Sequence, residues 1–157
     1  MSIAELLTAE RVVPKVEIAS KKRALEFLST LLAESNPNLD QGEVFASLLG
    51  REKLGSTGLG NHVALPHGRI ATQEEAIGAF ITLAKPIDFD AIDDQPVDLL
   101  FALVVPEEST SEHLEILARL AELFRDEKFC QQLRDASEPE ELLRLFSTWG
   151  LSDSSAA

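Results

Sequence analysis

Apolar residues recur three and four positions apart in five stretches of the chain, the spacing that places side chains on one face of a helix. The predicted helical faces lie within residues 24–32, 44–49, 114–124, 129–136 and 142–146. In the third, the face is Leu114, Leu117, Ala118, Ala121 and Phe124. Candidate N-caps precede four of the helices: Ser20, Asp40, Ser109 and Ser137. Glutamate follows the last three caps after three residues, at 43, 112 and 140, which is the capping-box pattern. A further short turn is predicted at residues 3–7.

Shorter apolar runs between these helices predict strands. Residues 12–18 are expected to be extended despite Pro14, and residues 63–65 and 76–83 favour strands. Residues 86–89 suggest a turn or short strand. Residues 97–105 are the most apolar segment, bounded by two prolines, and predict a buried central strand.

Alternating strands and helices predict an α/β fold, with one mixed β-sheet flanked by α-helices. We expect a single domain over residues 5–150. Gly150 is predicted to close the last helix, and residues 151–157 to form a flexible C-terminal tail.

Composition narrows the function classes. The 157 residues carry a formal charge of −13, which argues against nucleic-acid binding, since that depends on clustered Lys and Arg. An acidic surface suits a basic protein partner, but a solvated acidic face gives the same numbers. No apolar run approaches the roughly 20 residues of a membrane span. With one cysteine and no secretory signal pattern, the sequence predicts a cytoplasmic protein without membrane insertion.

The candidate chemistry is concentrated in residues 51–69, which hold four of the eight glycines and two of the three histidines. Gly55, Ser56, Thr57 and Gly58 predict a tight loop whose amides and hydroxyls suit an anion. His67 follows Pro66, whose ring fixes its own φ and biases the preceding residue to an extended conformation. His67 is therefore expected at a strand end.

Three other site classes fit poorly. The glycine-rich loop lacks the Lys and Ser/Thr that complete a P-loop, and the Gly-Ser-Thr-Gly spacing is wrong for a nucleophile elbow. His62 and His67 lie five apart across a strand, with no cysteine pair or second histidine pattern to support zinc. We therefore expect no metal and no cofactor.

A histidine can also carry a phosphoryl group, because its neutral imidazole nitrogen is nucleophilic near neutral pH. Arg51, the amides of residues 55–60 and a helix N-terminus could hold the phosphoryl oxygens. His113, in the first turn of its predicted helix, could lie near such an anion. From residue types alone, each histidine could equally be a surface or hydrogen-bonded structural residue.

The segments Arg-Glu-Lys-Leu-Gly-Ser-Thr-Gly-Leu-Gly-Asn (residues 51–61) and Val-Ala-Leu-Pro-His-Gly (residues 63–68) resemble the active-site signature of the mannitol/fructose-class IIA domains of the bacterial phosphotransferase system. Residues 89–106 and Glu112-His113-Leu114 are similar to the same family, and more closely to its nitrogen-regulatory branch. The resemblance covers roughly residues 5–150.

The resemblance implies that His67 accepts phosphate on Nε2 from a phosphohistidine of an HPr-like phosphocarrier protein of the nitrogen branch. Arg51 and His113 match supporting positions. His62 stands where the branch typically has glycine, so it receives no family role. The branch's regulated partners include potassium-transport regulators and sensor kinases.

Two functions follow from the resemblance, and a third stays open beside them. A regulatory protein would bind partners according to its phosphorylation state, whereas a transport component would pass phosphate to a separate IIB protein. The absence of a IIB-type cysteine loop or membrane segment from the sequence favours regulation. The third interpretation is a binding module that captures anions without phosphotransfer.

Overall fold

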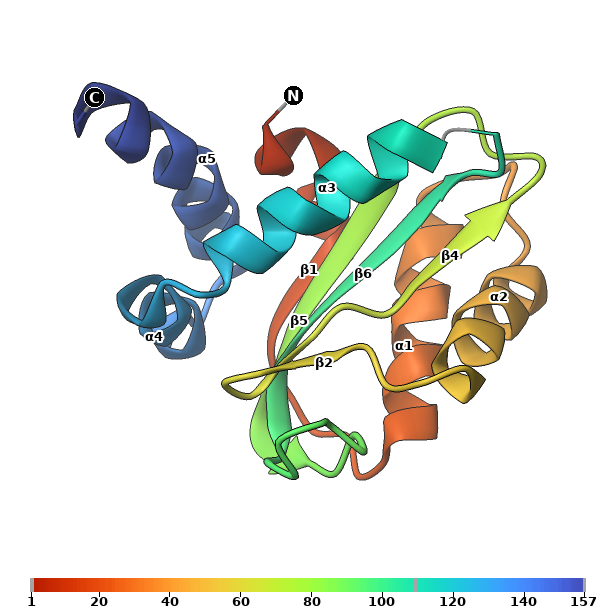
Figure 1. Ribbon diagram of the computed structural model, residues 1–157, viewed down its shortest axis with the longest axis horizontal. Helices are drawn as coiled ribbons and strands as arrows, with labels where there is room; N and C mark the ends of the chain where they lie inside the picture. The colour runs from red at the N-terminus through yellow and green to blue at the C-terminus, as the bar shows by residue number, and fades with distance from the viewer. Residues whose placement is uncertain (1, 109, 157) are drawn as a thin grey trace.

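A mixed β-sheet with helices on both faces makes up the computed structural model, which describes residues 2–108 and 110–156 (Figure 1). Its elements in chain order are the 3₁₀ turns η1 (Ile3–Leu6) and η2 (Ala9–Arg11), β1 (Val12–Val16), α1 (Lys21–Glu34), α2 (Gln41–Lys53), β2 (Gly58–Gly60), β3 (Val63–Ala64), β4 (His67–Ile70), β5 (Ile77–Ile87), β6 (Val97–Pro106), α3 (Thr110–Leu123), α4 (Glu127–Asp135) and α5 (Pro139–Ala156). The predicted α/β class and mixed sheet are confirmed.

The sheet is organised around β6. The strand order is β1-β5-β6-β3-β2, with β4 also paired to β6. β5 runs antiparallel to β6, whereas β3 and β4 both pair parallel to it, β3 at Leu99 and Leu100 and β4 from Leu103 to Pro106. β3 and β4 therefore act as one strand that is interrupted at Leu65 and Pro66. The interruption lies beside β6, directly before His67.

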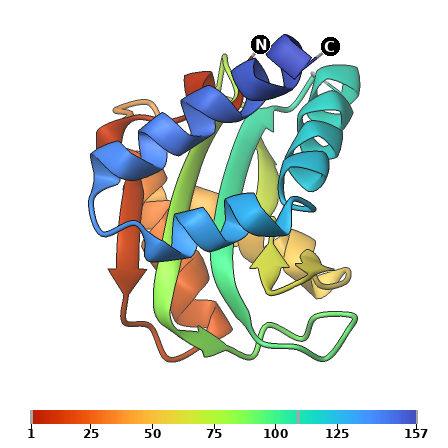
Figure 2. The same ribbon diagram turned by 90° about the vertical axis from the view of Figure 1, so that its left-hand side faces the viewer.

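Both faces of β6 are buried, as its continuous apolar run predicts. Leu99, Phe101 and Leu103 alternate with Leu100 and Ala102, and the two sets belong to separate apolar clusters. The first cluster includes residues of α3, α4, α5 and η1, and the second includes residues of α1 and α2. Figure 2 shows α3, α4 and α5 on the viewer's side of the sheet, with α1 and α2 behind it. The sheet is therefore covered by α3, α4 and α5 on one face and by α1 and α2 on the other.

Two predicted helix caps are confirmed. The hydroxyl of Ser20 accepts a hydrogen bond from the backbone N–H of Arg23 at 3.2 Å, and the carboxylate of Asp40 accepts one from that of Glu43 at 3.0 Å. Each satisfies a donor that the first helical turn leaves free. The cap predicted at Ser109 lies outside the described residues.

At α5 the capping box predicted with Glu140 is wrong by one residue. The backbone N–H and the hydroxyl of Ser137 both lie 3.4 Å from the carboxylate of Glu141. The same helix continues to Ala156, past the end predicted at Gly150. A glycine inside a helix costs only about 1 kcal/mol relative to alanine, so it does not by itself end one.

The predicted buried face of α3 is only partly confirmed: Phe124 is buried and Leu117 packs against the core, but other positions differ. Leu114 is 62% exposed, whereas Ile116 and Leu120 are buried together with His113. These three positions share the period of one helical face with Leu123. His113 thus occupies a core-facing position of α3, and apolar periodicity alone does not predict a histidine at such a position.

β5 is a single strand that includes Pro86, where the sequence predicts a strand and then a separate turn or short strand. Pro86 lacks the N–H that a regular ladder needs. The strand accommodates it because pairing with β6 is irregular between Thr82 and Ile87, and pairing with β1 ends at Leu83. No ladder hydrogen bond is therefore lost at Pro86.

Candidate functional site

His67 begins β4, at the interruption between β3 and β4. The backbone N–H of Leu103 on β6 donates to the carbonyl of Pro66 at 2.9 Å, which anchors the chain just before the histidine. The ring nitrogen Nδ1 of His67 lies 2.8 Å from the carbonyl oxygen of Leu65. A carbonyl only accepts, so Nδ1 carries the proton and Nε2 holds the free electron pair. The fold therefore presents Nε2 of a half-buried histidine as a nucleophile.

His113 faces His67 from α3. The ring centroids are 5.3 Å apart and the ring planes are nearly perpendicular, at 84°. His113 is only 5% exposed, and neither of its ring nitrogens has a hydrogen-bond partner within the described part of the chain. Buried polar atoms are nearly always paired, so an unpaired imidazole beside a nucleophilic histidine indicates a place for a ligand.

Both histidines are kept neutral. Burial lowers the pKa of His113 to about 4, helped by its proximity to His67 and Arg69. Burial is also the main cause that lowers the pKa of His67, and the charges of Arg51 and Arg69 act in the same direction. The Leu65 carbonyl and Glu52 act against this shift. A neutral imidazole is the form that can attack an electrophile.

The burial of His113 predicts a pH dependence of stability. Its pKa is about 4 in the folded chain, against about 6.5 for an unfolded histidine, so between these values only the unfolded chain binds the proton. The contribution of His113 to the free energy of unfolding is therefore complete above about pH 6.5 and is lost as the pH falls toward 4. Between about pH 7 and pH 4.5, we expect the free energy of unfolding of His113→Gln to fall by about 2 kcal/mol less than that of the wild type, as measured by urea denaturation. Parallel pH profiles of the two proteins would contradict this expectation.

Two arginines lie near His67. Arg51, in the last turn of α2, donates from Nη1 to the carbonyl of Gly55 at 2.9 Å. Arg69 is exposed on β4, two residues after His67 and on the same face of that strand. Arg51 was predicted from the sequence and Arg69 was missed, although its spacing of two residues from His67 along a strand was the signal that could have found it.

Gly68 brings α2 against β4. A Cβ atom at this position would overlap the hydroxyl oxygen of Ser47 and lie 3.0 Å from its Cβ. Ser47 donates to the carbonyl of Arg69 at 3.2 Å and precedes Arg51 by one helical turn. Glycine is therefore required beside His67 for a packing reason: it lets α2 carry Arg51 to the histidine.

The side chains of the predicted anion loop are hydrogen-bonded to other groups of the protein. Its members are Gly55, Ser56, Thr57 and Gly58. The hydroxyl of Ser56 donates to the carbonyl of Phe89 at 3.0 Å and accepts from the N–H of Gly58 at 3.1 Å. The N–H and hydroxyl of Thr57 both donate to the carboxylate of Glu52. These internal bonds fix the loop, and direct contact of the four residues with a phosphoryl group stays a prediction.

His62 lies in the turn between β2 and β3. Its φ is 68°, and Asn61 before it has φ 55°, a left-handed conformation that favours glycine. Nδ1 of His62 lies 2.8 Å from the carbonyl oxygen of Pro96. The ring helps line a pocket of about 440 Å³ with Cys130 and Arg134 of α4, whereas His67 pairs with His113.

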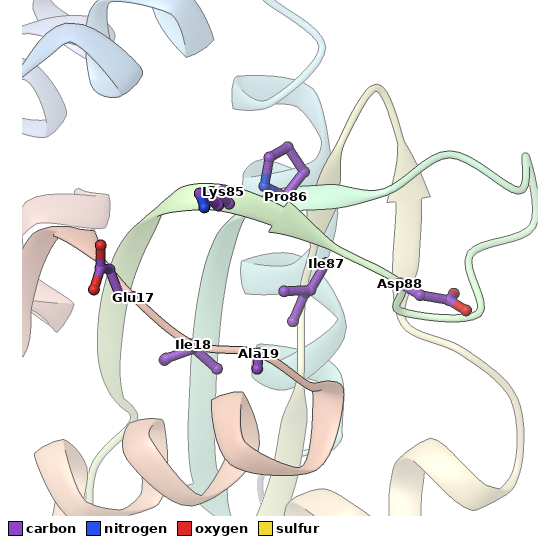
Figure 3. Close-up of a pocket in the computed structure, with 7 residues that line it drawn as sticks. All are labelled: Glu17, Ile18, Ala19, Lys85, Pro86, Ile87 and Asp88. Atoms are coloured by element: carbon purple, nitrogen blue, oxygen red, sulfur yellow. The ribbon is translucent and has the colours of Figure 1, made fainter.

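A second pocket, of about 510 Å³, lies between the β1–α1 connection and the end of β5 (Figure 3). Its lining is Glu17, Ile18, Ala19, Lys85, Pro86, Ile87 and Asp88. None of the predicted site residues is among them. The histidine pair therefore marks a site that is not one of these hollows.

Among residues 2–108 and 110–156, no three His, Cys, Asp or Glu side chains are grouped closely enough to hold a metal ion. No helix in that part of the chain is both long and apolar enough to cross a membrane.

Comparison with known proteins places this site in a family. Residues 5–149 match the family model described as "Phosphoenolpyruvate-dependent sugar phosphotransferase system, EIIA 2". The chain is 44% identical to the Nitrogen regulatory protein of Klebsiella oxytoca, over 96% of this chain and 93% of that protein. The crystal structure of Nitrogen Regulatory Protein IIA-Ntr from Neisseria meningitidis superposes with a TM-score of 0.85 and 46% identity, over 92% of this chain and 98% of that one.

The crystal structure of IIA mannitol from Escherichia coli shares the fold, with a TM-score of 0.75 and 24% identity over 89% of this chain and 98% of that one. The family match covers nearly all of the chain, including the elements that carry His67, His113 and Arg51. The chain belongs to the EIIA 2 family of the phosphoenolpyruvate-dependent sugar phosphotransferase system.

Proposed function

We propose that His67 is the phosphoacceptor of a phosphotransferase-system IIA protein. The observation that carries the proposal is the hydrogen bond from Nδ1 to the Leu65 carbonyl, which leaves the electron pair of Nε2 free beside the unpaired imidazole of His113. In the transfer, Nε2 forms a bond to phosphorus while the N–P bond of the carrier's phosphohistidine breaks. The carrier's ring nitrogen keeps the electron pair of that bond, and the proton of His67 stays on Nδ1, hydrogen-bonded to the Leu65 carbonyl.

The groups around His67 have separate roles in this step. Arg51 and Arg69 offset the negative charge of the phosphoryl oxygens. His113, neutral and unpaired, donates a ring N–H to one of those oxygens. The loop of Gly55, Ser56, Thr57 and Gly58 supports the phosphoryl group, because its first carbonyl holds the Arg51 side chain.

We further propose that the protein is a nitrogen-regulatory IIA protein that acts in the cytoplasm. The support is the identity of 44% over nearly its full length to a protein named for nitrogen regulation. Its donor would be an HPr-like carrier of the nitrogen branch, and its targets potassium-transport regulators or sensor kinases. It acts as a phosphocarrier with a phosphohistidine intermediate, and its phosphorylation state sets which partners bind.

Phosphorylation is expected to change partner binding by electrostatics, without a change of fold. A dianionic phosphoryl group on His67 alters the charge and the desolvation cost of the surface around it. We expect pull-downs from cytoplasm to recover different partners with the enzymatically phosphorylated protein than with the unphosphorylated protein and His67→Ala. A target that buries the neutral site is lost on phosphorylation, whereas one that offers arginines is gained.

Transport is the second candidate, because the matched family is described by sugar phosphotransfer. A IIB protein added to the phosphorylated chain distinguishes the two functions. Rapid loss of phosphate to IIB, with identical partners recovered in both phosphorylation states, would favour transport over regulation.

A further inference from the structure

A buried ion pair anchors the loop beside His67. Glu52, in the last turn of α2, has a side chain that is only 2% exposed. Its carboxylate lies 2.9 Å from Nζ of Lys21, in the first turn of α1. It also accepts hydrogen bonds from the backbone N–H of Thr57, at 3.1 and 3.3 Å, and from the Thr57 hydroxyl. A buried carboxylate with a cation and two donors is fully satisfied, so its position is well fixed.

Lys21 has further partners that tie the pair to the sheet. Its Nζ donates to the carbonyl of Phe89 at 3.2 Å and lies 4.6 Å from the centroid of the Phe89 ring. The hydroxyl of Ser56 donates to the same carbonyl at 3.0 Å. The loop is therefore held by α1, α2 and the segment after β5 at once.

Hydrogen bonds continue from this anchor to the imidazole. The carbonyl of Thr57 accepts from the backbone N–H of Leu65 at 3.0 Å. The carbonyl of Leu65 accepts from Nδ1 of His67 at 2.8 Å. Leu65, whose carbonyl fixes the tautomer of His67, is thus held through its own backbone N–H by Thr57. Thr57 in turn is bonded to Glu52.

We propose that Glu52 and Thr57, with Lys21 as the counter-ion, are positioning residues for phosphotransfer at His67. They hold Leu65 so that its carbonyl keeps the proton on Nδ1 and leaves Nε2 to attack phosphorus. This inference rests on the proposed function for its kinetic consequence, but its statement about the tautomer does not. In this role their side chains act through Leu65, because the hydroxyl of Thr57 is bonded to the carboxylate of Glu52.

Disorder in this network has a specific chemical consequence. When the Leu65 carbonyl moves, the His67 ring loses its preference for the Nδ1–H tautomer, and the other tautomer presents Nδ1 as the nucleophile. Phosphoryl groups would then form on both ring nitrogens. The transfer rate would fall as well, because a displacement of about 1 Å in a reacting group costs up to about 10²-fold.

A set of threonine variants tests the proposal. Thr57→Val removes the hydroxyl but keeps the size and the backbone N–H, and Thr57→Ser restores the hydroxyl. Thr82→Val is the matched control, since Thr82 is also a buried threonine, and its hydroxyl accepts from the N–H of Lys15 at 2.7 Å in another part of the sheet. Glu52→Gln tests the carboxylate independently, and it decides the matter if Thr57→Val does not fold.

Three measurements are made on each folded variant. They are the His67 tautomer by ¹⁵N NMR of the unphosphorylated protein, the phosphohistidine isomer by ³¹P NMR, and the single-turnover rate of transfer from the phosphorylated carrier. For Thr57→Val and Glu52→Gln we expect a mixed tautomer, some Nδ1 phosphohistidine and a rate reduced at least about tenfold. Thr57→Ser and Thr82→Val should keep the wild-type tautomer and isomer.

The outcomes separate this inference from the proposed function. If the wild type is not phosphorylated at all, the proposed function fails and the tautomer measurement alone decides the inference. If the wild type is phosphorylated, and both Thr57→Val and Glu52→Gln keep its tautomer and isomer, the inference is overturned. The same holds if Thr57→Val slows transfer only as much as Thr82→Val does, because that loss reflects stability alone.

Discussion

His67→Ala is expected to abolish phosphorylation of the protein by phosphoenolpyruvate, the first enzyme of the system and its carrier. The expectation follows from the geometry of the two facing histidines. His67 is half-buried with Nε2 unprotonated, whereas His113, which faces it, is almost fully buried. A second protein can therefore bring a phosphoryl group to His67 and not to His113.

The measurement is transfer of radiolabelled phosphate, followed by acid and base treatment of the product. Phosphohistidine is labile in acid and stable in base, so the wild type should lose its label only in acid. His62→Ala is the control, because that histidine lies in the β2–β3 turn with its Nδ1 beside the Pro96 carbonyl and should leave labelling intact. Label retained on His67→Ala would refute the assignment of the phosphoacceptor.

The parts of the fold that the sequence predicted are those set by local pattern. The apolar run of β6, the caps at Ser20 and Asp40, and the proline before His67 each act through neighbouring residues. These signals were sufficient to predict the mixed α/β sheet and a strand that ends before His67, but not that His67 begins a further strand, β4. They did not predict that β3 and β4 are one interrupted strand along β6, because pairing depends on residues more than 30 positions away.

The parts that were missed depend on contacts between distant segments. Thr57 was predicted to face an anion because a hydroxyl between glycines suits one, yet its hydroxyl is bonded to the buried carboxylate of Glu52. The buried carboxylate of Glu52 is paired with Lys21, which precedes Glu52 by 31 positions in the sequence. No local pattern indicates this contact. His113 was placed near the site, but its core-facing position contradicted the apolar face predicted for α3. A buried histidine therefore broke the apolar pattern that was used to predict the helix face.

Arg51→Ala is expected to slow phosphotransfer to His67 by about 10² to 10³, the usual cost of removing one electrostatic contact to a developing charge. Arg51 is placed for this role by α2, whose close approach to β4 depends on Gly68 and Ser47. Burial lowers the pKa of His67, and the charge of Arg51 adds to this shift by disfavouring the protonated ring. The same charge should act more strongly on a phosphoryl dianion at Nε2, because the opposite charges then attract in a partly desolvated site.

Rapid-quench measurement of single-turnover transfer from the phosphorylated carrier tests this effect. Arg51→Lys is the matched variant, since it keeps the charge but replaces the planar group that reaches the Gly55 carbonyl, and it should fall between Ala and the wild type. His113→Gln should also slow transfer, by removal of the ring N–H while its amide keeps some donor capacity. The folded state should persist in both Arg51 variants, because the side chain of Arg51 makes only one hydrogen bond within the described residues. If Arg51→Ala and His113→Gln both transferred phosphate at the wild-type rate, electrostatic assistance at this site would be wrong, and positioning of His67 would have to account for the rate by itself.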